Sequence, residues 1–240
     1  MVDLSVEMAE LWTSLGGGLG RPPGGSSGRG RAIEFIAARD GEGVSTVARE
    51  FALYATRRLR RRVWLIDLDL MDQTQAEVFA RDPVRYGALG PATSATPNES
   101  MFFTVQPPLK RPDGRPWADS RYISAHSVGA DGLWVTRFRR EAMRGRQGVH
   151  VTPTADYWNV LRRHAELVVI DAPAVSRSQA GLTVAPFMDE VVLVLAADET
   201  DTRAPTRLRD ELDASGANVA GLFVNRVEVE APTFLRGAAL

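Results

Sequence analysis

The sequence predicts an α/β fold in which a doubly wound, mostly parallel β-sheet carries helices on both faces. Three observations predict this fold. Apolar runs with little polar alternation, which are typical of strands buried on both faces, recur at residues 32–37, 63–67, 167–170, 190–195 and 219–224. Amphipathic stretches separate several of these runs, and a glycine-rich turn joins the first run to a helix. Strands that alternate with helices in this way indicate a parallel sheet covered on both sides.

The composition excludes several classes of site. The chain of 240 residues has no cysteine, which rules out disulfides and thiolate metal sites. Its net charge of −1 argues against a general nucleic-acid binder. No apolar run reaches the roughly 18–20 residues that span a bilayer, and the N-terminus lacks a basic start followed by an apolar core. We therefore expect a cytoplasmic protein that has no signal peptide and binds no nucleic acid.

Three segments are predicted along the chain. Residues 1–15 form an N-terminal helix, and residues 16–30 form a linker, because this stretch consists almost entirely of Gly, Pro, Ser and Arg. Residues 31–240 form a single domain. Within it, the stretch at about 87–132 is rich in Pro, Gly and Ser and is predicted to be an irregular insertion with small strands inside it.

Apolar spacing predicts the faces of the first two helices. The face of the N-terminal helix is expected to consist of Val6, Leu11, Trp12 and Leu15. The face of a second helix, which begins near Ser45, is expected to consist of Val47, Phe51, Ala55 and Leu59. The arginines among residues 57–62 are expected to lie in the last turns of that helix, where its dipole favours cations.

The turn between the first strand and this helix carries the clearest chemical signal. Its residues are Ala38, Arg39, Asp40, Gly41, Glu42, Gly43, Val44, Ser45 and Thr46. Glycines let the backbone approach an anion closely, and the N–H groups at the start of a helix point toward it. A P-loop has Gly, four residues, then Gly-Lys-Ser/Thr, but here Ala38 replaces the first glycine and Val44 replaces the lysine. The sequence therefore predicts a P-loop-like phosphate site with a degenerate loop.

Aspartates follow two of the apolar strands. Asp67 and Asp69 end the second run, and Asp171 ends a later one. The carboxyl ends of parallel strands meet at the edge where such sheets bind ligands, and carboxylates there can hold hydrated Mg²⁺ beside a phosphate. The alternative interpretation is that these side chains only cap helices or end strands. Their order along the chain favours the metal site.

The order of these motifs gives the chain a family resemblance. The glycine loop is followed by residues 63–69 (Val-Trp-Leu-Ile-Asp-Leu-Asp), residues 167–173 (Leu-Val-Val-Ile-Asp-Ala-Pro) and residues 221–226 (Gly-Leu-Phe-Val-Asn-Arg). This order resembles the bacterial tyrosine kinases of polysaccharide export and, more broadly, the MinD/ParA class of P-loop ATPases. The Gly-Glu-Gly-x-Ser-Thr loop and the Asp-x-Asp strand end favour the kinase branch. The fold class that the resemblance implies is P-loop NTPase-like.

The resemblance implies ATP or ADP with Mg²⁺ as cofactors, and roles for individual residues. The phosphate-binding residues would be Arg39, Asp40, Gly41, Glu42, Gly43, Val44, Ser45 and Thr46. The metal side would consist of Ser45, Asp67, Asp69 and Asp171, with Asp67 also activating the attacking hydroxyl or water. Asn225 would contact the adenine, with Arg226 beside it.

Two departures from the family concern activity. An apolar side chain at Val44 cannot neutralise phosphate charge, and losing one preorganised donor typically costs about 10²–10³ in rate. Arg39 lies where the MinD/ParA class has its signature lysine, so it is the candidate replacement, although a guanidinium is not equivalent to an ammonium. The family phosphorylates a C-terminal tyrosine cluster, whereas the last tyrosine here is Tyr157.

A third departure concerns assembly. The kinases begin with a Glu-x-x-Arg-x-x-Arg helix that packs on the next subunit. Glu7 matches its first residue, but Glu10 and Thr13 replace both arginines. Ring formation through this contact is therefore not expected, and other self-association stays open.

Three hypotheses follow. The leading one is a degenerate, kinase-like regulator, a pseudokinase, of exopolysaccharide or capsule assembly or export. It would bind nucleotide weakly or not at all and act through the cytoplasmic part of a membrane polysaccharide co-polymerase, which would recruit it to the inner membrane. The second is an active MinD/ParA-type ATPase, or an autokinase, with Arg39 in place of the lysine. The third is a doubly wound domain that binds another small ligand or none.

Overall fold

The computed structural model describes residues 4–16, 29–60, 62–96, 98–198 and 203–227. Its centre is a seven-stranded sheet. In spatial order the strands are β4 (Ile123–Val128), β5 (Leu133–Phe138), β2 (Val63–Asp67), β7 (Leu167–Asp171), β1 (Arg31–Ile36), β8 (Glu190–Ala196) and β9 (Val219–Asn225). All neighbours are parallel except β4 and β5. The predicted mostly parallel sheet is confirmed.

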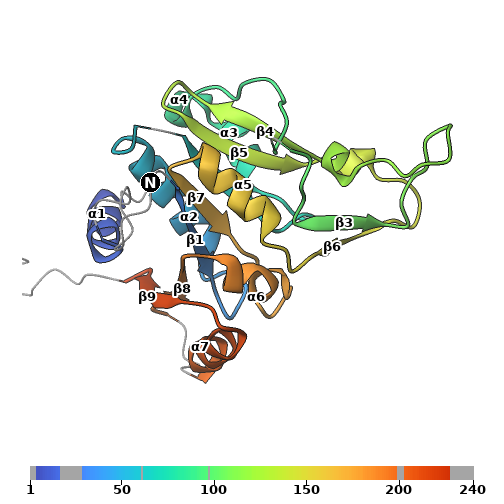
Figure 1. The fold of residues 1–240 in the computed structure, drawn as a ribbon. Coiled ribbons are helices and arrows are strands. Elements are labelled where there is room, and N and C mark those ends of the chain that lie inside the picture. The colour runs from blue at the N-terminus through green and yellow to red at the C-terminus, as the bar shows by residue number, and fades with distance from the viewer. Residues whose placement is uncertain (1–3, 17–28, 61, 97, 199–202, 228–240) are drawn as a thin grey trace, which may run out of the picture.

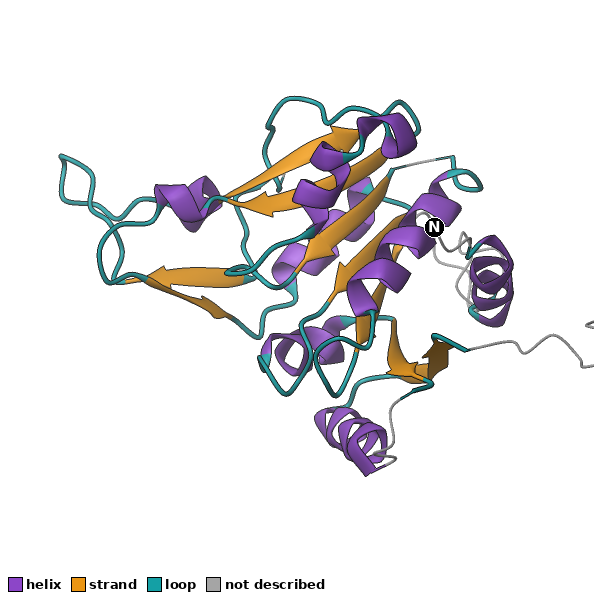
Figure 2. Ribbon diagram, turned by 180° about the vertical axis from the view of Figure 1, so that it is seen from behind, coloured by secondary structure: helices purple, strands orange, loops and turns teal. Residues whose placement is uncertain are grey.

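Helices cover both faces of the sheet (Figures 1 and 2). One apolar cluster joins the sheet to α1 (Ser5–Ser14), α2 (Val44–Thr56) and α3 (Gln75–Arg81). The other joins it to α5 (Asp156–His164), α6 (Ala180–Val184) and α7 (Arg203–Ser215). The central strands β2 and β7 are buried along their whole length, which explains why they appear in the sequence as unbroken apolar runs.

Short elements complete the chain. They are α4 (Pro83–Tyr86) and the 3₁₀ turns η1 (Asp119–Tyr122), η2 (Arg140–Ala142) and η3 (Ala185–Phe187). A separate two-stranded antiparallel sheet, formed by β3 (Phe103–Gln106) and β6 (Gly148–Val151), extends to one side of the main sheet (Figure 1). No helix in the described ranges is long and apolar enough to cross a membrane.

The face by which α1 packs differs from the predicted one. Met8, Trp12 and Leu15 are buried, whereas Val6 is 68% exposed. The spacing of four and then three residues places the three buried side chains on one stripe of the helix. The Trp12 ring lies 6.1 Å from the ring of Phe51 on α2. The prediction for Val6 was therefore wrong because it ignored the better stripe that begins at Met8.

The arginines after α2 also differ from the prediction. The helix ends at Thr56, so Arg57, Arg58, Arg60 and Arg62 follow it rather than forming its last turns. The backbone N–H groups of Arg58 and Leu59 both donate to the carbonyl oxygen of Ala55, at 2.9 and 3.0 Å, and close the helix there. The guanidinium of Arg58 folds back over the ring of Tyr54 instead.

The stretch 87–132, predicted to be an irregular insertion with small strands, includes β4, which is an edge strand of the main sheet. β4 pairs with β5 in antiparallel register from Ile123 to Val128. The sequence of β4 includes Ser124, His126 and Ser127, so it shows no continuous apolar run. Antiparallel edge strands tolerate such polar positions, which is why the apolar pattern indicated only a small strand at Tyr122 and Ile123, at the start of β4.

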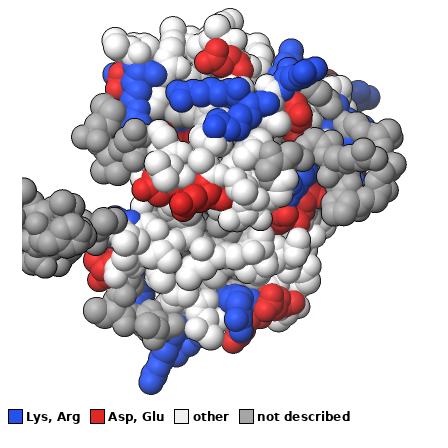
Figure 3. Space-filling view, turned by 90° about the vertical axis from the view of Figure 1, so that its left-hand side faces the viewer, with Lys and Arg blue, Asp and Glu red and all other residues white. Residues whose placement is uncertain are grey.

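At the opposite edge of the sheet, β9 and α1 leave a groove of about 380 Å³. Apolar side chains that line it include Leu11, Leu15, Leu222 and Val224, and Glu7 and Glu10 lie on the helix side. The space-filling view of this side shows a group of acidic side chains beside a mostly uncharged band, with basic side chains above and below them (Figure 3). The sheet is therefore less covered at β9 than at its centre.

Candidate functional site

The glycine loop connects β1 to α2 and is shaped by the end of β9. Gly43, with φ of +91°, immediately precedes α2. A Cβ atom on Gly43 would lie 2.1 Å from Nδ2 of Asn225, whereas one on Gly41 would meet nothing within 4 Å. The same Nδ2 donates a hydrogen bond to the carbonyl oxygen of Glu42 at 3.0 Å. Position 43 therefore requires glycine both for its conformation and for the approach of Asn225.

Two further contacts hold the loop. The guanidinium of Arg226 donates to the carbonyl oxygen of Gly41 and lies 3.5 Å from the carboxylate of Asp198. The carboxylate of Glu42 accepts the backbone N–H of Arg39 at 2.9 Å. Asn225 and Arg226, which the resemblance places near an adenine, thus contact the backbone of the loop in this structure.

Val44 occupies the lysine position without facing outward as a lysine would. Its side chain is 7% exposed and belongs to the apolar cluster beneath α1 and α2. The loop encloses a cavity of about 190 Å³ that residues 39–46 line together with residues 172–174 and Arg177. Backbone N–H groups at the start of α2 suit an anion there, but position 44 supplies no positive charge.

The aspartates Asp67 and Asp171 lie side by side, as the parallel register of β2 and β7 dictates. Ser45 Oγ donates to one oxygen of Asp171 at 3.1 Å, and Gln75 Nε2 donates to the other at 2.7 Å. Asp67 Oδ2 accepts the backbone N–H groups of Thr74 and Gln75 at 3.0 and 3.1 Å. The predicted grouping of Ser45, Asp67 and Asp171 is thus present in the structure.

Burial changes the acidity of both carboxyl groups. Asp67 is 1% exposed and Asp171 is 3% exposed. Burial, and next the negative charge of Asp171, raise the pKa of Asp67 well above its usual value, although the two backbone N–H groups oppose the shift. Burial raises the pKa of Asp171 to about 6 against the opposing hydrogen bonds from Gln75 and Ser45. A proton or a cation at this pair would therefore relieve its repulsion.

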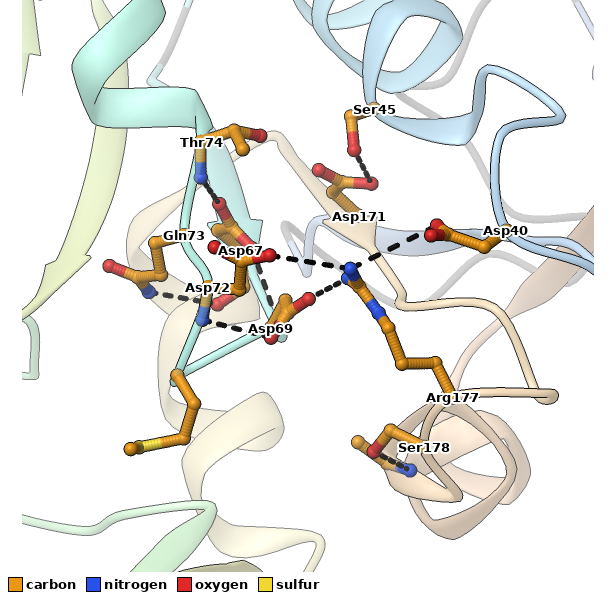
Figure 4. Close-up of polar contacts among 12 residues, drawn as sticks. Asp40, Ser45, Asp67, Asp69, Asp72, Gln73, Thr74, Asp171, Arg177 and Ser178 are labelled. Carbon is orange, nitrogen blue, oxygen red and sulfur yellow. Dashed lines mark hydrogen bonds and ion pairs between the residues drawn. The ribbon is translucent and has the colours of Figure 1, made fainter.

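Asp69, the third predicted metal-side residue, is engaged by a cation that sequence analysis missed. Arg177, in the loop between β7 and α6, forms an ion pair with Asp69. Its guanidinium also lies 3.5 Å from Asp72 and 3.9 Å from Asp40 (Figure 4). The only signal for Arg177 in the sequence is a basic residue six positions after Asp171.

Gln75 and Arg49 were missed as well. Gln75 is fully buried at the start of α3, where its amide Nε2 also donates to the carbonyl oxygen of Ser45 at 2.7 Å. Its Oε1 accepts a hydrogen bond from Arg49 on α2 at 3.1 Å. Gln75 therefore connects the acidic pair to α2.

A second cavity of about 150 Å³ lies over the acidic residues. Arg177 lines both this cavity and the loop cavity. The Ser45 hydroxyl and the carboxylates of Asp67 and Asp171 are oxygen ligands of the kind that Mg²⁺ prefers, and Mg²⁺ in nucleotide sites usually takes one or two carboxylates together with phosphate. In the part of the chain that the structure describes, no group of three His, Asp or Glu residues is arranged to hold a metal ion.

Comparison with known structures supports the fold. The kinase domain of the Escherichia coli tyrosine kinase ETK superimposes with a TM-score of 0.60 at 15% identity, over 96% of this chain and 79% of that one. The chain shares its fold with bacterial tyrosine kinase domains. The VpsO kinase domain gives a TM-score of 0.56 at 18% identity, over 93% of this chain and 96% of that one.

The likeness extends to nucleotide-bound proteins. A cobyrinic acid a,c-diamide synthase from Mycobacterium smegmatis, with ADP and magnesium bound, gives a TM-score of 0.53 at 14% identity, over 81% of this chain and 74% of that one. No protein-family model and no curated protein matches the sequence. At these identities the comparisons establish a P-loop NTPase-like fold.

Proposed function

We propose that this protein is a kinase-like regulator of bacterial exopolysaccharide or capsule production that has lost phosphoryl transfer. The observation that carries the proposal is the burial of Val44 in the apolar core at the position where a P-loop has its lysine. Kinases stabilise the charge that develops on a transferred phosphoryl group, and removing one such donor typically costs about 10²–10³ in rate. The fold shared with bacterial tyrosine kinase domains supports the pathway.

The proposed partner is the cytoplasmic part of a membrane polysaccharide co-polymerase. The chain would be cytoplasmic and would reach the inner membrane through this partner. Regulation by binding needs the folded surface but not catalysis, so a chain that keeps the fold and loses the phosphate cation could still perform it. ATP or ADP with Mg²⁺ would bind weakly or not at all, and self-association is not required.

The test separates binding from catalysis with Asp67→Asn, which keeps the shape of the side chain and removes its charge. A strain that lacks the gene is complemented with the wild type or with this variant, and the exopolysaccharide is quantified. The proposal predicts equal yields, with no ATP hydrolysis or protein phosphorylation by either purified protein. Robust turnover by the wild type that Asp67→Asn abolishes, together with a loss of polysaccharide, would overturn it.

One observation supports a second candidate function. Arg39 lines the loop cavity, so a MinD/ParA-type ATPase or autokinase could use its guanidinium in place of the missing lysine. This candidate predicts measurable ATP hydrolysis in the wild type that Arg39→Gln removes.

A further inference from the structure

The two residues before Arg177 are held by backbone hydrogen bonds to the segment that leads from β1 into the glycine loop. The N–H groups of Val175 and Ser176 donate to the carbonyl oxygens of Ala37 and Ala38 at 3.0 and 3.1 Å. The N–H of Arg177 itself donates to the carbonyl oxygen of Ala174 at 2.9 Å. The loop that carries Arg177 is therefore attached directly to the phosphate loop.

The guanidinium of Arg177 joins two segments of the site. Asp40 belongs to the glycine loop, whereas Asp69 and Asp72 belong to the connection between β2 and α3, and all three carboxylates lie within ion-pairing distance of it. The close-up shows the guanidinium in the space between these segments (Figure 4). Two of these carboxylates are also linked to each other through the backbone, because Asp69 accepts the backbone N–H of Asp72 at 3.1 Å.

We propose that Arg177 is the resident cation of this edge and that it keeps a divalent metal ion off the carboxylates. The inference rests on the proposed loss of phosphoryl transfer and gives that loss a second physical cause, independent of Val44. Because Arg177 lines the acidic cavity as well as the loop cavity, a divalent ion there would meet its positive charge at close range. Admitting the metal requires Arg177 to release Asp69 and move away.

The geometry distinguishes Arg177 from Arg49 and Arg226, two other arginines at this edge. The guanidinium of Arg49 contacts Gln75 and Thr46, and that of Arg226 contacts Gly41 and Asp198. Arg177 has ion pairs with three carboxylates, and one of them, Asp69, is on the predicted metal side. Neutralising Arg177 should therefore change divalent-ion binding more than neutralising another arginine.

The test measures binding of Mn²⁺, used as a paramagnetic probe in place of Mg²⁺, to the full chain without nucleotide or partner. Arg177→Gln removes the charge, and Arg177→Lys keeps it. Arg209→Gln is the matched control for net charge, because Arg209 is an exposed arginine on α7 that also contacts aspartates. Electron paramagnetic resonance of free Mn²⁺ gives the affinity, and circular dichroism shows that each variant is folded.

Arg177→Gln is expected to bind Mn²⁺ about tenfold more tightly than the wild type or more, and adding Asp69→Asn should abolish the gain. Arg177→Lys and Arg209→Gln should resemble the wild type. Wild-type protein that binds Mn²⁺ as tightly as Arg177→Gln would overturn the inference, and so would an equal gain in Arg209→Gln.

If Arg177→Gln does not fold, Arg177→Lys and the wild type still decide, because micromolar Mn²⁺ binding by either would overturn the inference. Such a result would leave the proposed regulatory role untouched, since that role is tested by polysaccharide yield.

Discussion

The loop that follows β1 and the carboxylates that follow β2 and β7 lie at one edge of the same sheet, but they are stabilised differently. Asp67 and Asp171 are held by hydrogen bonds that they accept from Ser45, Thr74 and Gln75. The loop has its glycines and the hydrogen bond from Asn225 to Glu42, whereas Val44 packs in the apolar core.

This difference shows which features of the site the fold itself maintains. Gly43 is enforced sterically by Asn225, and the carboxylates have protein donors, so both are stable without a ligand. A lysine at position 44 would serve only a bound phosphate, and an apolar residue there gains burial instead. Once the protein no longer binds the ligand, we therefore expect evolution to replace the lysine before it replaces the glycine or the aspartates.

The largest expected effect comes from adding a Cβ at Gly43. Gly43→Ala forces a left-handed conformation on alanine, at roughly 1–3 kcal/mol, and brings a methyl group against Asn225, at roughly 1–3 kcal/mol more. The free energy of unfolding should fall by about 2–6 kcal/mol in urea titrations. Gly41→Ala is the matched control, because it has the same φ sign and open space, and should cost only the left-handed conformation itself, about 1–3 kcal/mol. Equal losses would show that Asn225 does not constrain the loop.

Beside the acidic pair Asp67 and Asp171, Gln75→Ala should destabilise the protein by about 1–3 kcal/mol. The substitution leaves buried groups on Asp171 and Arg49 without the hydrogen bond that Gln75 supplies. Thermal unfolding followed by circular dichroism measures the loss. Gln179→Ala, on the exposed loop before α6, is the control and should change stability by less than about 0.5 kcal/mol. A neutral Gln75→Ala would mean that the acidic pair does not depend on this amide.

The raised pKa values of Asp67 and Asp171 predict a pH dependence. Because a carboxyl with a raised pKa favours folding most when protonated, stability should fall as the pH rises from about 4 through about 6, the pKa of Asp171. Asp67→Asn removes one of the two titrating carboxyls, so the fall in stability above about pH 4 should become shallower. Urea titrations at four pH values test this, and an unchanged slope would contradict the assignment of the repulsion to this pair.

The smallest effect is expected at the outer contact of the loop. Arg226 is half exposed and so is its partner Asp198, and exposed ion pairs contribute about 0–1 kcal/mol. Arg226→Ala should leave the unfolding midpoint nearly unchanged while amide hydrogen exchange of residues 40–43 becomes faster. Unchanged exchange would show that Asn225 alone holds the loop.

The sequence was sufficient for the sheet, because β2 and β7 are buried on both faces and appear as unbroken apolar runs. It was also sufficient to bring Ser45, Asp67 and Asp171 together, since parallel strands end at a common edge. It indicated only the start of β4, at Tyr122 and Ile123, because the polar residues of this antiparallel edge strand interrupt the apolar pattern. It missed Arg177 and Gln75 because their partners lie far along the chain, and only the packed fold places a loop residue after β7 against Asp40 and Asp69.

The most direct test of the central claim is calorimetric titration of the wild type and of Val44→Lys with ATP in the presence of Mg²⁺. The account predicts that the dissociation constant of ATP for the wild type lies above about 1 mM. It predicts a lower dissociation constant for Val44→Lys, because this variant restores the missing cation to a loop whose backbone is intact. Micromolar binding to the wild type, accompanied by ATP hydrolysis, would contradict the account.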